Sequence, residues 1–169
     1  NNRAPSAGIK DLFKILVDHL VVCFEAQWNS NNQMPHIHDS LLISLIGPNT
    51  IPEEAARNRA RNSGLPFQSN FRFLKIVTPE SSNIMLQRIE REIISAIPDA
   101  KITLHQQSLL VLISQPPKNT DKFSEYMVHI KKVLTMYNAL CGVSDKFTLL
   151  SDVKLAHEQA KLALSSAKS

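Results

Sequence analysis

The stretch that decides the fold lies at 142–164 and reads Gly142-Val-Ser-Asp-Lys-Phe-Thr-Leu-Leu-Ser-Asp-Val-Lys-Leu-Ala-His-Glu-Gln-Ala-Lys-Leu-Ala-Leu164. It starts inside an apolar run, passes through a short polar connection and closes on an alanine-rich segment. Short apolar runs bounded by polar residues are typical of buried strands, and alanine is the strongest helix former. We therefore predict a strand at about 140–143 and a final helix at about 152–167.

Upstream of this tail the pattern changes at Asn70. Residues 71–77 are apolar on both faces apart from Arg72 and Lys75, which predicts a strand in a central position of a sheet. A helix should follow from about 82 to 96. Its predicted buried side consists of Met85, Ile89, Ile93 and Ile97, and Pro98-Asp99 closes it.

The next segment predicts a hairpin and a further helix. Apolar runs at 100–104 and 109–114 flank four polar residues, as in two strands joined by a turn. A helix is predicted at about 121–137, before the strand of the tail. The order βαββαβα indicates an α+β domain of the ferredoxin-like or palm type, with a mainly antiparallel four-stranded sheet and two helices on one face.

Three predicted helices precede the first strand. The second covers about 39–46, and the third has Thr50 as its N-cap and ends at Gly64. We expect residues 1–66 to form a helical connector, or the end of a sensor domain, and residues 67–169 to form the α+β domain.

The first helix, at about 9–28, has a wide apolar stripe. The stripe consists of Ile9, Leu12, Phe13, Leu16, Val17, Leu20, Val21, Phe24 and Trp28. So much apolar surface has to be covered, because each exposed CH2 group forgoes roughly 0.8 kcal/mol of burial free energy. Packing within the same chain and packing in a homodimer both fit a stripe of this width.

The composition fits one ordinary helix-rich domain. The chain has 169 residues, of which 43% are hydrophobic and only 4 are glycine, which argues against disorder and an all-β sandwich. Cys23 and Cys141 belong to no CxxC motif, so we expect buried thiols in a reducing cytosol. The net charge of +4 comes from scattered bases, which do not predict a nucleic-acid surface. No apolar run predicts a membrane span, and we expect a cytoplasmic protein.

The quoted tail resembles the close of the degenerate GGDEF-like domain in PucR/CdaR-type bacterial transcriptional regulators. The resemblance covers about residues 41–169 and includes Leu41-Leu-Ile-Ser-Leu-Ile46 and the helix ending in Arg61-Asn-Ser-Gly-Leu-Pro66. It implies a cyclase-like fold, a sensing region upstream and a DNA-binding helix-turn-helix downstream of Ser169. The chain would then be the middle of a longer regulator and would meet DNA only through that absent motif.

The resemblance also locates the positions at which a diguanylate cyclase has its signature. These positions are occupied here by His105, Gln106, Gln107, Ser108 and Leu109. In a cyclase the signature glycines let the backbone approach GTP and the acids bind metal. Neither residue type is present. After the first predicted strand only Glu80 is in place, and an inhibitory-site Arg-x-x-Asp would fall on Ala96 and Asp99.

We therefore expect a non-catalytic module, without cofactor or metal, that forms a homodimer and relays a signal from an unidentified effector. Two alternatives stay open. One is a divergent nucleotide-binding, cyclase-like enzyme in which Glu80 and Asp99 serve the metal. The other is a small-molecule sensor with its pocket between the N-terminal helices and the sheet.

Other polar patterns predict ordinary surface. His36-Ile-His38-Asp39 has no third ligand nearby, so we expect a polar turn rather than a metal site. Arg57, Arg59 and Arg61 predict a solvated helix face. The histidines at 19, 129 and 157 are interpreted as surface or hydrogen-bonded core residues.

Overall fold

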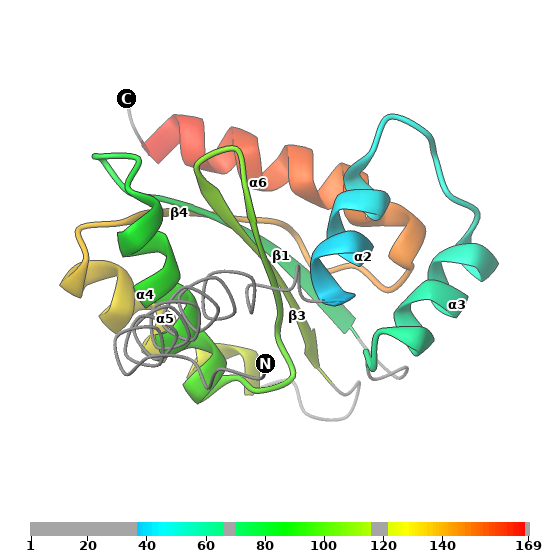
Figure 1. Ribbon diagram of the computed structural model, residues 1–169, viewed down its shortest axis with the longest axis horizontal. Coiled ribbons are helices and arrows are strands. Elements are labelled where there is room, and N and C mark those ends of the chain that lie inside the picture. Colours follow the sequence, from blue (N-terminus) through cyan, green and yellow to red (C-terminus); the bar gives the residue numbers. More distant parts are fainter. Residues whose placement is uncertain (1–36, 66–69, 116–121, 168–169) are drawn as a thin grey trace, which may run out of the picture. The chain divides into compact units, whose positions relative to one another are not determined.

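The computed structural model describes residues 37–65, 70–115 and 122–167, with side chains from residue 41 onward. The elements in chain order are α2 (Ile37–Ile46), α3 (Glu53–Asn62), β1 (Asn70–Val77), α4 (Asn83–Ala96), β2 (Lys101–His105), β3 (Ser108–Gln115), α5 (Lys122–Met136), β4 (Leu140–Val143), the 3-10 turn η1 (Leu150–Asp152) and α6 (Val153–Ala167) (Figure 1). They belong to one compact unit that begins at His36. The helix predicted at 9–28 lies outside the described residues.

The four strands form one antiparallel sheet in the order β2-β3-β1-β4. β1 lies between β3 and β4, with Ile76 opposite Leu109 on one side and Lys75 opposite Gly142 on the other. The central position predicted for the first strand is therefore confirmed. Helices cover both faces of the sheet, which explains why this strand is apolar on both of its faces.

One face of the sheet is covered by α4 and α5. The core on this side contains Ile89 and Ile93 of α4 and Ile130 and Val133 of α5, packed against the side chains of β1 and β3 that point their way. The prediction of two helices on one face is confirmed. Met85, which was expected on the buried side of α4, is only half-buried, and Leu86 lies in the core instead.

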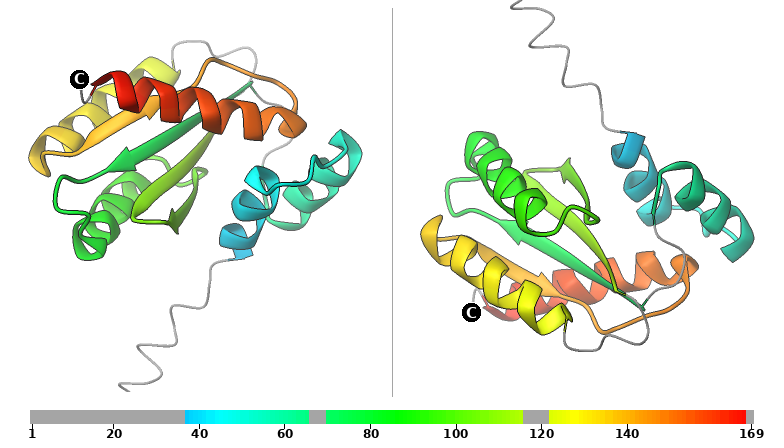
Figure 2. Two further views of the ribbon diagram at one scale, coloured as in Figure 1. Left: turned by 90° about the horizontal axis from the view of Figure 1, so that it is seen from above. Right: turned by 90° about the horizontal axis from the view of Figure 1, so that it is seen from below.

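The opposite face is covered by α6 and α2, while α3 packs against α2 and η1 and adds Ala56 and Ala60 to the same core. Figure 2 shows α6 lying along the sheet and α3 beside it. The approach of α6 to β4 is close. A Cβ built on Gly142 would lie 1.9 Å from the carbonyl oxygen of Ala160. Only glycine leaves room there, so Gly142 lets the backbone of α6 lie directly on the strand.

Helix α2 extends this second layer. Leu41, Leu42 and Leu45 are buried in the same core as Ala156 and Ala160 of α6. Residues 37–62, predicted within an N-terminal connector, therefore share a core with the sheet. Whether residues 1–66 also act as a connector stays a prediction.

Local signals set most helix ends. The hydroxyl oxygen of Ser82 accepts a hydrogen bond from the backbone N–H of Met85 (3.4 Å) and caps α4. Gly64, with φ +67°, ends α3, and the N–H of Leu65 reaches the carbonyl of Ala60 (3.0 Å). The prediction of Thr50 as the N-cap of α3 was wrong: the cap position is Pro52, and no side chain caps it.

The fold class is thus the predicted one, an α+β arrangement of the ferredoxin-like or palm type with an additional last helix. Among the described helices, none combines the length and the apolar character that crossing a membrane requires.

Candidate functional site

The hairpin of β2 and β3 contains the five residues singled out in the sequence, with His105 at the end of β2 and Ser108 and Leu109 at the start of β3. Gln106 and Gln107 both have positive φ, 45° and 58°, which is the backbone of a two-residue type I′ turn. His105 is opposite Ser108 at the end of the ladder, and the Ser108 hydroxyl donates to the carbonyl oxygen of His105 (2.6 Å). The hairpin prediction is confirmed. The Ser108–His105 hydrogen bond joins the two ends of the turn, and the turn contains no glycine.

The exposed part of this turn carries amides. Gln106 and Gln107 are exposed, His105 is half-buried, and Ser108 and Leu109 are buried. An amide can donate and accept hydrogen bonds, but it lacks the negative charge that holds Mg2+. The turn can therefore contact a partner through hydrogen bonds, whereas it offers nothing to neutralise a metal ion.

The loop after β1 lies at the same end of the sheet, because Ile76 near the end of β1 is opposite Leu109 at the start of β3. Thr78 organises this loop: its carbonyl accepts from the N–H of Ser81 (3.1 Å) and its hydroxyl oxygen from the N–H of Ser82 (3.2 Å). Glu80 is exposed between them. Among the described residues of this loop and the neighbouring turn, Glu80 is the one carboxylate.

Asp99 lies at the other end of the sheet. It precedes Lys101, the first residue of β2, which is level with Phe73 through their common partner Leu112. Glu80 follows Val77, the last residue of β1. Phe73 and Val77 are separated by four residue steps, about 13 Å at 3.3 Å per residue. The structure does not bring the two acids together.

The described residues contain no group of three or more His, Cys, Asp or Glu side chains that could hold a metal ion. Two acids at opposite ends of a sheet cannot share a pair of ions, which in two-metal sites are only about 4 Å apart. The arrangement around the turn therefore supports hydrogen bonding and surface contact.

Comparison with protein families identifies the family to which the fold belongs. Residues 47–166 match the model of the GGDEF-like domain. The chain belongs to the GGDEF-like domain family. A search of curated proteins finds no match to the chain. The family match begins at residue 47, ahead of α3, so this helix belongs to the GGDEF-like domain by sequence as well as by its contacts with the core.

A groove of about 390 Å³ lies on the GGDEF-like domain beside the N-terminal end of α6. Its apolar lining comes from Leu45, Ile51, Leu150 and Leu155, and its polar lining from Thr50, Ser151, Asp152, Lys154 and Glu158. The ammonium group of Lys154 donates to the carbonyl of Pro48 (2.9 Å), which connects α6 to the α2–α3 connection. No signal in the sequence pointed to this groove, because its lining comes from three separate segments.

Glu53 of α3 connects this helix to η1, which lies beside the groove. Its carboxylate accepts from the N–H of Ser151 (2.8 Å) and pairs with Arg57 (2.6 Å). Burial raises the pKa of Glu53, but the hydrogen bonds from Ser151 and Arg57 outweigh this effect, and the net pKa is lowered. Arg57, Arg59 and Arg61 are all exposed, as the sequence predicted.

Cys141, His129 and His157 are titratable side chains that are at least half-buried. Burial raises the pKa of the Cys141 thiol to about 12, so this cysteine is an unreactive, partly buried thiol; Cys23 lies outside the described residues. His129 and His157 are both half-buried on their helices, between the surface and the core positions that the sequence allowed. In each, Nε2 is buried and has no hydrogen-bond partner among the described residues.

Proposed function

We propose that this GGDEF-like domain is a non-catalytic regulatory module of a PucR/CdaR-type transcriptional regulator. In this role it dimerises and relays a signal to a helix-turn-helix outside the chain. The observation that carries the proposal is the turn His105–Leu109, which has glutamines where a cyclase needs glycine and carboxylate. A domain that has kept the fold without these groups serves through its surfaces.

The relay would use the rigidity of the domain. Both faces of the sheet are covered by packed helices, so displacement of one helical layer is transmitted through a dense core rather than absorbed by it. The stripe at 9–28, predicted from the sequence, supplies the apolar surface for a homodimer. α6 ends near the C-terminus of the chain and would be the direct connection to a downstream DNA-binding motif.

The catalytic part of the proposal is tested with GTP. We expect no nucleotide turnover with millimolar GTP and Mg2+ or Mn2+, and no rise in melting temperature, because a ligand that binds the folded state must stabilise it. Turnover of GTP, or a melting shift abolished by Glu80→Gln, would contradict the proposal and favour the cyclase-like alternative.

The dimerisation part is tested by light scattering on the full chain and on a chain that begins at His36. The shorter chain retains the compact unit and lacks the predicted stripe. We expect a dimer that becomes a monomer on shortening. A monomer in both cases would remove dimerisation from the proposal.

A second candidate, a small-molecule sensor, is favoured by the groove of about 390 Å³ beside α6. This volume lies within the ordinary range for small-ligand sites. A screen for compounds that raise the melting temperature tests it, with Leu155→Arg as the variant that should abolish the shift, since Leu155 is 62% exposed and its replacement spares the core.

A further inference from the structure

His157 of α6 has an unusual environment for a histidine. Its side chain is only 14% exposed, and its ring stands edge-on to Phe73 of β1, with 5.5 Å between ring centroids. Phe73 is fully buried. Nε2 of His157 is shielded from solvent without a hydrogen-bond partner among the described residues. A neutral imidazole tolerates such a place at modest cost, whereas an imidazolium there would be a buried and incompletely solvated charge.

The charges around His157 add to this cost. Lys75 follows Phe73 by two residues and so shares its face of β1, and Lys161 lies one turn further along α6. His105 at the end of β2 also disfavours a charge on the ring of His157. One acid opposes them: Glu158, whose carboxylate lies 3.7 Å from Nδ1 of His157 and 3.5 Å from Nζ of Lys161, and which is 53% exposed. Three of these four groups, Lys75, Lys161 and His105, therefore disfavour a charged ring.

The other elements that contact α6 are α2, β4 and η1. Asp152 of η1 and Asp145, whose carboxylate accepts from the side-chain amide of Gln159 (3.4 Å), are the acids on this side, and neither shifts the pKa of His157. α2 presents only Leu, Ile and Ser among its described side chains, and Cys141 of β4 belongs to the core on the opposite face. Burial lowers the pKa of His157, and Lys75, Lys161 and His105 lower it further, while Glu158 acts in the opposite direction.

We propose that His157 makes the docking of α6 on β1 and β4 sensitive to protonation: the helix packs tightly when the ring is neutral and loosens when the ring takes up a proton. The close approach at Gly142 supports this, because it holds the backbone of Ala160, three residues after His157, directly against β4. The proposal rests on the packing of the fold and is independent of the proposed regulatory function.

The direction of the effect follows from linkage. A histidine released from the docked state takes up its proton at the ordinary pKa of about 6.5, whereas the docked ring takes it up only at lower pH. The docked state therefore has its full stability above pH 6.5. This contribution is lost progressively as the pH falls from there through the lower pKa of the docked ring.

Amide hydrogen exchange on the full chain at pH 7.5 and pH 5.0, with each rate divided by the intrinsic rate at that pH, tests the proposal. We expect the protection of amides in 156–164 to fall at pH 5.0, by about tenfold for each unit by which the docked pKa lies below the ordinary one, up to a limit of about thirtyfold that is set by the roughly 1.5 units between pH 5.0 and the ordinary pKa. Peptides from α4 and α5, on the other face, should keep their protection.

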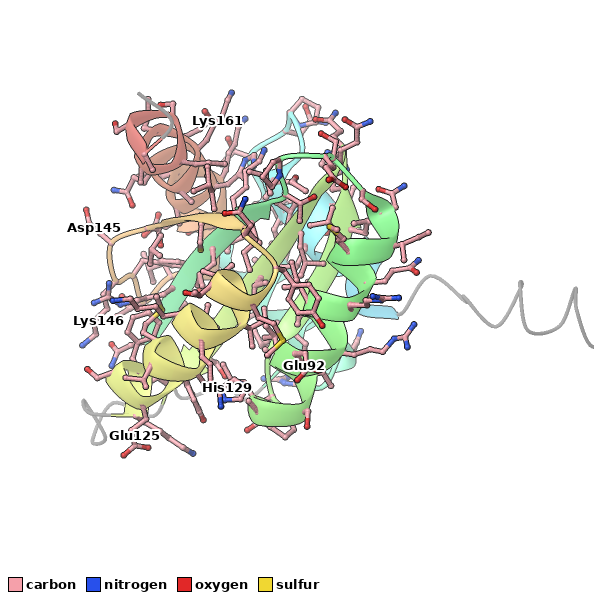
Figure 3. All side chains as sticks on the ribbon, turned by 90° about the vertical axis from the view of Figure 1, so that its left-hand side faces the viewer. Glu92, Glu125, His129, Asp145, Lys146 and Lys161 are labelled. Atoms are coloured by element: carbon pink, nitrogen blue, oxygen red, sulfur yellow. The ribbon has the colours of Figure 1, made fainter. Side chains whose placement is uncertain are left out.

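Two variants assign the effect. His157→Phe, which keeps a ring against Phe73, should make the protection of α6 equal at both pH values, and His157→Gln serves as a second neutral replacement. His129→Gln is the matched control: His129 also has a buried, unpartnered Nε2, but lies on α5, away from Lys161 of α6 (Figure 3), and its replacement should leave the pH dependence of α6 intact.

Three results would overturn the proposal: equal protection of α6 at both pH values in the unchanged chain, pH dependence that persists in His157→Phe, or pH dependence lost in His129→Gln. Should both variants at 157 fail to fold, an NMR titration of the His157 ring in the unchanged chain decides. A ring that titrates at or above pH 6.5 would contradict the proposal.

Discussion

At the scale of single residues, Gly142 couples the sheet to its last helix. A Cβ at this position would lie 1.9 Å from the carbonyl oxygen of Ala160 and 2.8 Å from the backbone nitrogen of Leu164. Both are backbone atoms, so no side-chain rotation can relieve the overlap. We expect Gly142→Ala to lower the free energy of unfolding by about 3 kcal/mol, the upper part of the usual range for overpacking, as measured by urea denaturation.

Gly47 provides the control for this substitution. A Cβ at Gly47 would meet its nearest atom, the carbonyl oxygen of Ser44, at 3.4 Å, which is ordinary contact. Gly47→Ala should therefore change the free energy of unfolding by less than about 0.5 kcal/mol. If the two alanine variants were equally stable, α6 would not lie on β4 as closely as described.

At the scale of elements, the β2–β3 hairpin has a turn whose sequence does not match its backbone. Gln106 and Gln107 both adopt positive φ, although a left-handed conformation costs a residue with a Cβ roughly 1–2 kcal/mol. Asn-Gly is the preferred pair for this turn. We expect Gln106→Asn combined with Gln107→Gly to raise the free energy of unfolding by about 1 kcal/mol in urea titrations.

Gln107→Val should change the free energy of unfolding in the opposite direction, because a β-branched residue is strained at positive φ. It should destabilise the domain by about 1 kcal/mol. Should the Asn-Gly variant be the less stable one, the glutamine side chains must make contacts that offset the strain, and the turn would become a candidate for a built binding surface.

The elements that the sequence predicted are those whose signals are local. The apolar run at 109–114, the helix start near residue 82 and the helix breaker at Gly64 each depend on neighbours in the chain, and the structure has a strand or a helix end at each. The cap of α3 was misplaced because Thr50 and Pro52 both suit a helix start, and only the packing of Glu53 onto Ser151 decides between them.

The environment of His157 could not be predicted, because it depends on contacts between residues far apart in sequence. Phe73 and Lys75 come from β1, more than 80 positions earlier, and whether a helical histidine faces water or the sheet depends on the rotation of α6. The polar connection at 105–108, by contrast, was predicted from the two apolar runs that flank it, and the structure has a hairpin turn there. That residues 105–109 occupy the signature positions follows from the family resemblance and stays a prediction. Their loss of function as a cyclase site stays a prediction that the GTP experiment tests.

At the scale of the whole molecule, the position of α2 decides where the folded domain begins. Leu41, Leu42 and Leu45 are at most 5% exposed and share a core with α6, even though the family match starts only at residue 47. Burying a leucine side chain contributes about 1.5–3 kcal/mol, so α2 supplies several kcal/mol, a large part of the stability of an ordinary domain.

A chain that begins at His36 should therefore unfold cooperatively with its α6 amides protected, because it retains both cores on the two faces of the sheet. A chain that begins at Pro48 should melt about 10 °C lower or fail to fold, since each kcal/mol lowers the melting temperature by about 4 °C in domains between the 100- and 150-residue classes. Calorimetry on the two chains measures the difference. Equal melting temperatures would mean that α2 is dispensable, and that the domain is limited to the residues of the family match.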